Sequence, residues 1–152
     1  MSNYLMVEKD GYTISNDPSK IEVETVYEYL STQSYWAQNI PYAVVQTSIQ
    51  NSFCFGVFFE SRQVGFARLI TDKATFAYLA DVFILPGHRG KGLSKWLMQT
   101  MQNLPELQGL RRWLLGTKDA HGLYAQFGWT PFTDEQTKRF MQLHNPEVYK
   151  AE

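Results

Sequence analysis

Apolar and polar residues alternate along this chain with two different periods, and the change between them marks the expected helices and strands. In the segment that opens at Ser19, apolar residues recur three and four positions apart, at Val23, Val26, Tyr27 and Leu30. A second segment opens at Pro41 and repeats this spacing with Tyr42, Val45 and Ile49. Residues three and four apart share one face of a helix, so the spacing predicts two helices. A short strand is expected before them, at Gly11–Ser15.

Three strand-like segments joined by short turns follow the second helix. They cover Phe53–Glu60, Gln63–Ile70 and Thr75–Leu85. Strands joined in this way pair antiparallel, so the segments predict a meander. Alternation in the third segment assigns one face to Phe76, Tyr78, Ala80, Val82 and Ile84. Asp81 and Phe83 are then expected on the opposite face.

The pattern returns to the helical period after Pro86. The next expected elements are a helix over Leu93–Asn103, a strand over Arg111–Thr117 and a short helix from Ala120 that ends at Gly128. Two last strands are expected in the tail, at Trp129–Phe132 and Arg139–His144. Strands interleaved with helices in this order predict an α/β fold, a mixed sheet with helices packed on it.

Composition and charge restrict the class of protein. A chain of 152 residues that is 44% hydrophobic suits one packed domain, residues 1–152. A net charge of −1 does not indicate binding to nucleic acid or to an anionic membrane. No stretch of the sequence is long and apolar enough to resemble a membrane-spanning helix. Cys54 is the only cysteine, so no disulfide can form within the chain. We therefore expect a cytoplasmic protein with Cys54 buried as a small apolar residue.

The glycine-rich turn before the third helix carries the first candidate chemistry. A strand ends, glycines leave room above the backbone, and a helix begins with unpaired N–H groups at Leu93. Such a junction binds anions, and Arg89 adds a guanidinium. An ordinary strand-to-helix turn is the alternative. The segment lacks the Gly-Lys-Ser/Thr end of a P-loop and the third glycine of a Rossmann turn.

Two separated motifs stand out in the sequence. The run Asp81–Ser94 joins a strand to an Arg-x-x-Gly-x-Ser turn formed by Arg89, Gly92 and Ser94. Downstream, Ala120–Trp129 is a short helix with a tyrosine and a Gly-aromatic end. Both motifs resemble those of the GNAT superfamily of N-acetyltransferases, whose turn has the form (Arg/Gln)-x-x-Gly-x-(Gly/Ala) and whose tyrosine helix ends in the same way. The resemblance extends from about Tyr12 to Phe132. It implies a mostly antiparallel central sheet between two layers of helices.

The resemblance also implies a co-substrate, acetyl-coenzyme A, and no metal. Its pantetheine arm would pair with the strand backbone, its pyrophosphate would lie on the turn, and Thr117 holds a place where relatives often carry Asn. The cofactor-binding residues implied are Val82, Phe83, Ile84, Arg89, Gly90, Lys91, Gly92, Leu93, Ser94, Lys95 and Thr117.

Acetyl transfer needs an acid for the departing thiolate and a route for the proton of the amine. The resemblance assigns the acid to Tyr124, whose spacing beside Leu123 and Phe127 also fits a core aromatic. Asp81 is the candidate base, and a strand carboxylate that only accepts hydrogen bonds is the equal alternative.

The loop between the first two helices is the candidate acceptor site. Tyr35 and Trp36 either line a substrate pocket there or form a lid on the core. The expected acceptor is a primary amine of a small molecule or a peptide. A non-catalytic acyl-CoA-binding regulatory module and a plain nucleotide-binding domain are the competing functions. The aromatic tail Phe140–Tyr149 is a candidate homodimer interface.

Overall fold

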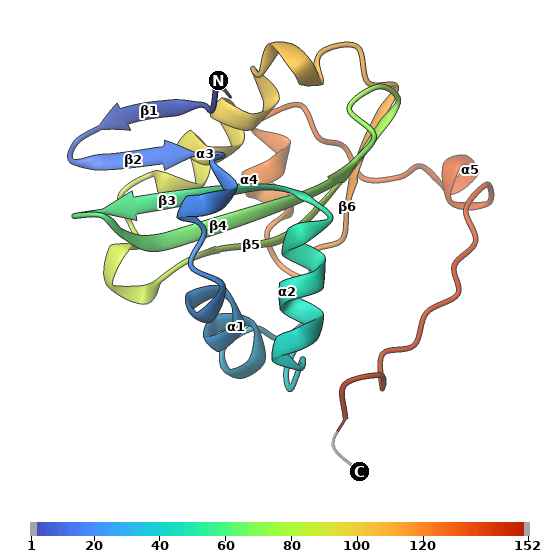
Figure 1. Ribbon diagram of the computed structural model, residues 1–152. Helices are drawn as coiled ribbons and strands as arrows, with labels where there is room; N and C mark the ends of the chain where they lie inside the picture. Colours follow the sequence, from blue (N-terminus) through green and yellow to red (C-terminus); the bar gives the residue numbers. More distant parts are fainter. Residues whose placement is uncertain (1–2, 151–152) are drawn as a thin grey trace.

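The chain forms one six-stranded sheet in which the strands follow their order in the sequence. The computed structural model describes residues 3–150 (Figure 1). The strands are β1 (Met6–Lys9), β2 (Tyr12–Ser15), β3 (Phe53–Phe59), β4 (Arg62–Thr71), β5 (Phe76–Ile84) and β6 (Arg112–Leu115). All neighbours pair antiparallel except β5 and β6, which are parallel. The meander expected from residue 53 onward is therefore confirmed, and β1 is a strand that the pattern did not indicate.

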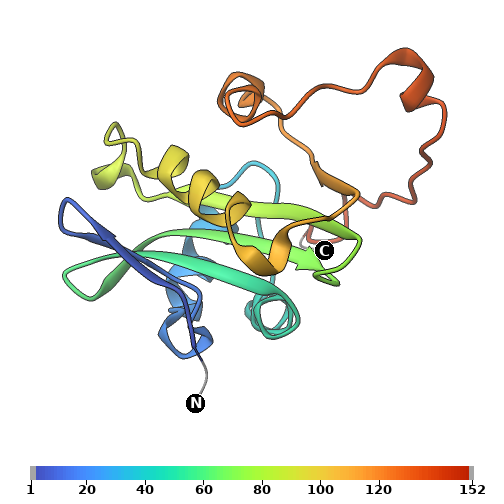
Figure 2. The same cartoon turned by 90° about the horizontal axis from the view of Figure 1, so that it is seen from above.

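Helices cover both faces of this sheet. They are α1 (Val23–Thr32), α2 (Tyr42–Gln50), α3 (Leu93–Gln102), α4 (His121–Ala125) and α5 (Asp134–Thr137), with short 3-10 turns at Pro18–Lys20, Pro86–His88 and Pro105–Leu107. Figure 2 shows α1 and α2 on one side of the sheet and α3 on the other. The expected three-layer α/β architecture is confirmed.

Each face of the sheet has its own apolar core. On the α3 and α4 side, Phe55 and Leu69 of the sheet pack with Leu97 and Met101. On the α1 and α2 side, Phe66 and Phe83 lie with the apolar faces of the two helices. Continuous apolar runs such as Phe53–Phe59 follow from this arrangement, because a strand that is covered on both faces has no polar face.

The first helix begins later than Ser19. Glu22 is its N-cap residue and Val23 its first helical residue. The carboxylate of Glu22 accepts a hydrogen bond from the backbone N–H of Gln63 at 2.7 Å, so it joins the start of the helix to β4. The expected helix start was therefore wrong by one turn.

A β-bulge in β5 also changes which residues share a face. Phe66 pairs with Phe83 and Arg68 with Ala80, so Asp81 and Val82 together oppose the single residue Ala67. Asp81 adopts a left-handed backbone conformation with φ of 56°. The uninterrupted stripe expected from Phe76 to Ile84 is therefore wrong. Val82 and Ile84 belong to the α3-side core, as do Ala77 and Leu79, which the unbroken alternation would place on the other face.

The parallel pair β5–β6 is short, and this shortness opens the sheet. Pairing runs from Phe76 with Arg112 to Leu79 with Leu115, and then β6 ends while β5 continues to Ile84. Beyond Leu79, the edge of β5 that faces β6 is therefore without a strand partner in the described part of the chain.

The two strands expected in the tail do not form within residues 3–150. Every residue from Thr130 to Val148 is exposed, and the only regular element there is α5. In the same described range, no helix has the length and apolar content needed to cross a bilayer.

Candidate active site

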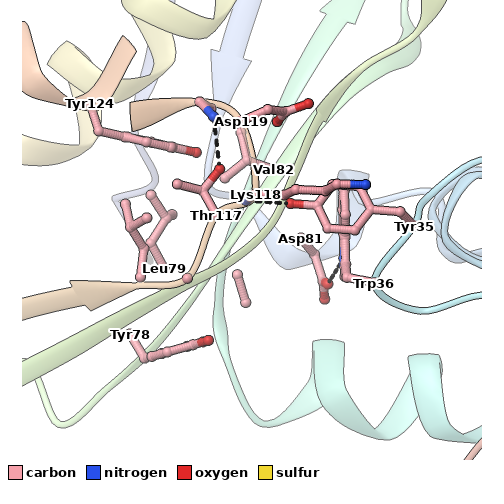
Figure 3. A pocket seen from close by; sticks show the side chains of 14 residues that line it. Tyr35, Trp36, Tyr78, Leu79, Asp81, Val82, Thr117, Lys118, Asp119 and Tyr124 are labelled. Carbon is pink, nitrogen blue, oxygen red and sulfur yellow. Dashed lines mark hydrogen bonds between the residues drawn. The ribbon is translucent and has the colours of Figure 1, made fainter. Parts of the chain in front are cut away.

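The gap where β5 and β6 part is a cavity of about 530 Å³. One wall is β5 from Tyr78 to Val82, and the opposite wall is the segment Leu115–Ala120 that follows β6. Tyr124 enters from α4, and Tyr35 and Trp36 from the loop between α1 and α2 (Figure 3). The predicted acid, the candidate base and the predicted acceptor-site aromatics therefore share one cavity.

The glycine-rich turn has the open geometry that an anion site needs. Gly90 and Gly92 have φ of 79° and 74°, a region that L residues with a side chain rarely adopt. A Cβ atom placed on either glycine would meet no other atom within 4 Å, so the space above the turn is free. Gly92 caps α3, whose first N–H groups, from Leu93 onward, have no partner inside the helix. These amides and the positive end of the helix dipole share a direction.

Two hydrogen bonds hold the side chain of Arg89 in place. Its Nε donates to the carbonyl of Ile84 at 2.8 Å, and its terminal nitrogen donates to the hydroxyl of Tyr29 at 3.0 Å. Tyr29 in turn stacks on Phe83, with ring centroids 4.1 Å apart. Arg89 thus braces the turn against β5 and α1. Tyr29 is part of this support, and no sequence pattern could connect residues 60 positions apart.

The predicted pantetheine-binding strand can offer its backbone. Phe83 and Ile84 are only 4% and 6% exposed, so their side chains belong to the two cores. Val82 lines the cavity directly. Hydrogen bonds from the unpaired edge of β5 are therefore the contacts that these three residues can supply to an extended ligand.

Tyr124 lies at the inner end of the cavity. It is 9% exposed and packs its ring against Trp129, while its hydroxyl points toward Thr117 across the cavity (Figure 3). Burial raises the pKa of the Tyr124 phenol, and the nearby Tyr35 adds to the shift. The phenol is therefore protonated throughout the neutral range and has a proton to donate.

Thr117 occupies the opposite wall. Its Oγ1 accepts a hydrogen bond from the backbone N–H of Ala120 at 3.1 Å, which fixes the start of α4. The hydroxyl hydrogen stays available for a ligand in the cavity, because a hydroxyl can donate and accept at once.

Both carboxylate oxygens of Asp81 accept hydrogen bonds. Oδ2 accepts a hydrogen bond from Nε of Arg68 at 2.8 Å, within an ion pair whose side chains are 15% and 10% exposed. Oδ1 accepts from the indole Nε1–H of Trp36 at 2.9 Å. Arg68 also donates to the hydroxyl of Ser52 at 3.1 Å. The bulge aims Asp81 at these partners, and neither Arg68 nor Ser52 was indicated by the sequence.

Tyr35 and Trp36 tie the helix-connecting loop to both sides of the cavity. Trp36 reaches β5 through Asp81, and the Tyr35 hydroxyl accepts a hydrogen bond from the backbone N–H of Lys118 at 2.9 Å. The two rings meet edge to face with centroids 5.0 Å apart, and they are 52% and 40% exposed. Because the two residues join the two walls of the cavity, we refer to the pair as the lid, and both rings line the cavity.

The remaining titratable groups have other roles. Cys54 is buried, and burial raises the pKa of its thiol to about 12, as expected for a packing residue. Nδ1 of His88 lies 2.8 Å from the hydroxyl of Tyr12, outside the cavity wall. His121 is exposed on α4.

The fold and this cavity together define the class of protein. A mostly antiparallel mixed sheet between two layers of helices, with a glycine-rich turn that leads into α3, is the arrangement that the resemblance implied. Residues 23–129 match the model of the Acetyltransferase (GNAT) family. The chain belongs to this family.

Individual relatives agree with that assignment. A Gibberella zeae protein named "Putative acetyltransferase FG08082" is 34% identical over 78% of each chain. A GNAT-family protein of Xanthomonas campestris pv. campestris is 48% identical, and its crystal structure superposes with a TM-score of 0.87 over 92% of this chain and 97% of its own. A more distant GNAT structure from Elizabethkingia anophelis has acetyl-CoA bound. It is 12% identical, covers 78% of this chain and 76% of its own, and has a TM-score of 0.58, so it supports the fold alone.

Proposed function

We propose that the protein is an acetyl-CoA-dependent N-acetyltransferase whose acceptor is a primary amine of a small molecule or a peptide. The observation that carries this proposal is the position of Tyr124. Its protonated hydroxyl faces the same cavity as the unpaired edge of β5. The acid and the strand that would hold the thioester therefore line the same cavity.

The co-substrate would bind mainly through backbone groups. The pyrophosphate would accept hydrogen bonds from the amides of Gly90–Lys95, with the exposed Lys91 and Lys95 close by. The pantetheine arm would pair with Val82, Phe83 and Ile84 as an added strand. Thr117 would donate its hydroxyl hydrogen from the other wall. Arg89 would act by holding the turn in shape.

Transfer would proceed by direct attack. The neutral amine nitrogen bonds to the thioester carbonyl carbon, and the oxyanion that develops is stabilised by N–H groups of β5. The C–S bond then breaks, and the thiolate of coenzyme A takes the proton of the Tyr124 hydroxyl. The amine releases its proton to water, and the Tyr124 phenolate recovers one from solvent.

Asp81 has two candidate roles, and its hydrogen bonds favour the anchoring one. Both carboxylate oxygens already accept hydrogen bonds, from Arg68 and Trp36. To act as a base, Asp81 would have to lose the Trp36 contact and take up a proton next to a guanidinium. We infer that Asp81 anchors the Tyr35–Trp36 lid, so that the two rings shape the acceptor site.

A thiol-release assay with acetyl-CoA and a panel of amines tests the proposal. Free thiol should form only when an amine is present, with one acetyl group found on the amine for each thiol. Acetyl-CoA that binds tightly but is not consumed with any amine would establish the alternative, a regulatory acyl-CoA-binding module. Competition by ATP or NAD would indicate a plain nucleotide-binding domain, and we expect none.

We also place the protein in the cytoplasm. A single buried cysteine suits a reducing compartment, and acetyl-CoA is expected there as the co-substrate. Free thiol on Cys54 in freshly isolated protein, measured after unfolding, is the expected result.

A further inference from the structure

Two carboxylates line the cavity, and only one of them already has a cationic partner. Asp81 forms an ion pair with Arg68. Asp119 lies on the other wall, in the segment that follows β6, and it is exposed. Within residues 3–150, Asp119 takes part in no ion pair, and no hydrogen bond reaches its carboxylate. Asp119 is therefore the carboxylate of this cavity that is free to bind a cation.

The backbone on both sides of Asp119 is held in place. The N–H of Lys118 donates to the hydroxyl of Tyr35 at 2.9 Å, and the N–H of Ala120 donates to Oγ1 of Thr117 at 3.1 Å. The first of these hydrogen bonds joins the segment to the lid. Asp119 thus has a defined position beside the lid, although it lies in neither a strand nor a helix.

The aromatic rings of the lid suit the same ligand. The faces of tyrosine and tryptophan rings attract cations, and both rings of the lid line the cavity. The ammonium of Lys118 lies 5.7 Å from the centre of the Tyr35 ring, so this ring already attracts one cation. A carboxylate next to aromatic ring faces is a combination that binds ammonium groups.

The reacting nitrogen of the acceptor is a poor partner for Asp119. This nitrogen must be neutral when it attacks the thioester, and a carboxylate in contact with it would stabilise its protonated form. The proposed acid, Tyr124, is 9% exposed, whereas Asp119 is exposed, and Figure 3 shows the Asp119 carboxylate apart from the Tyr124 hydroxyl. The cation that suits Asp119 is therefore a second group of the acceptor, one that stays charged during the transfer.

We propose that Asp119 selects acceptors that carry a second cationic group besides the reacting amine, as a diamine does. This inference rests on the proposed function, because it names the acceptor of that same site. The cationic group binds the Asp119 carboxylate beside the lid, and the neutral amine reaches the inner end of the cavity near Tyr124. A cavity of about 530 Å³ is large enough for a small molecule of this kind.

Two amines of similar size test the selection by turnover. Diaminobutane has a cationic far end, and aminobutanol has a neutral hydroxyl there. The ratio of their kcat/KM values, diamine over amino alcohol, should be about tenfold lower in Asp119→Asn than in the wild type, because a hydrogen bond to a charged group is lost. Comparing ratios removes the difference in intrinsic reactivity between the two amines.

Two further variants serve as controls. Asp119→Glu keeps the charge and should keep most of the preference for the diamine. Asp134→Asn removes the same charge from the exposed first turn of α5 and should leave the ratio at its wild-type value. A ratio that falls equally in Asp134→Asn would assign the preference to the net charge of the protein and would overturn the role of Asp119.

Binding is measured separately from transfer. In an NMR titration of the full chain without acetyl-CoA, diaminobutane should shift the backbone amides of residues 118–120. Its Kd should rise about tenfold in Asp119→Asn, while the Kd of aminobutanol should be the same in both proteins. An equal Kd of diaminobutane for the two proteins, or the absence of any shift at these amides, would overturn the proposal.

A structural role for Asp119 gives a different result. A carboxylate just before α4 could stabilise the start of that helix. Its loss would then lower the melting temperature and impair both amines equally, and this outcome would overturn the selection. Transfer to both amines with an unchanged ratio would leave the proposed function intact and contradict only the role of Asp119. Diamine binding that depends on Asp119, without transfer to any amine, would contradict only the proposed function.

Discussion

The proposed active site has two halves, one for the cofactor and one for the acceptor, and they are constructed in different ways. The proposed cofactor half is mainly one continuous segment, from Val82 in β5 through the glycine turn to Lys95 in α3, and it offers mainly backbone groups. The acceptor half combines side chains from four separate places: the lid at Tyr35 and Trp36, Arg68 in β4, Asp81 in the bulge and Tyr124 in α4. The cofactor half depends on local backbone shape and the acceptor half on tertiary packing. Substitutions in the two halves should therefore impair different properties of the enzyme.

The largest effect is expected from the acceptor half. Tyr124→Phe removes the proton that the leaving thiolate takes, and kcat should fall by about 10²–10⁴-fold. The ring and its contact with Trp129 remain, so the Kd for acetyl-CoA and the melting temperature should not change. Tyr78→Phe removes a hydroxyl from the same cavity and should have little effect. Equal activity of the two variants would mean that Tyr124 is a packing residue.

A substitution in the cofactor half should affect binding first. Gly92→Asp places a carboxylate where the pyrophosphate is proposed to lie and strains a residue with φ of 74°. Affinity for acetyl-CoA, measured by calorimetry, should fall about 100-fold, which corresponds to about 2.7 kcal/mol. Gly109→Asp is the matched control, because Gly109 also has a positive φ and open space but lies far along the chain from the turn. An equal loss of affinity in both variants would mean that backbone strain causes the loss and that the phosphate site lies elsewhere.

The lid should affect the acceptor alone. Trp36→Phe keeps an aromatic ring but loses the hydrogen bond to Asp81, so the KM for the amine should rise about tenfold. Because Trp36 is 40% exposed, the melting temperature and the Kd for acetyl-CoA should stay near their wild-type values. An unchanged KM would show that the lid only covers the core.

The last prediction has no effect on either half of the proposed active site and concerns the stability of the fold at alkaline pH. Burial raises the pKa of Cys54 from 9.0 to about 12. The thiol then ionises more easily in the unfolded chain, so its contribution to stability is complete below pH 9 and is lost between pH 9 and 12. The loss is on the order of 1.4 kcal/mol per pH unit. The stability difference between wild type and Cys54→Ala should therefore shrink over this range in urea unfolding, and a constant difference would contradict the burial of this thiol.

The same contrast explains what the sequence could predict. The turn at Gly90–Lys95 is visible because glycines, a preceding strand and a following helix are neighbours in the chain. The hydrogen bond between Arg89 and Tyr29 spans 60 positions, and the pair of Arg68 with Asp81 depends on a bulge that an alternating pattern does not reveal. The strand expected at Arg139–His144 does not form, because an alternating pattern does not show whether a neighbouring strand is present, and no strand pairs with this segment within residues 3–150.

One measurement addresses acetyl transfer most directly. The protein is incubated with acetyl-CoA that carries an isotopic label in the acetyl group, together with the amine that gives the highest rate in the thiol-release panel. The masses of all products are then measured by mass spectrometry. Direct transfer predicts label on the amine, an equal amount of free coenzyme A and none on the protein. Label on the protein would contradict direct attack, and acetyl-CoA recovered intact would contradict the proposed enzyme.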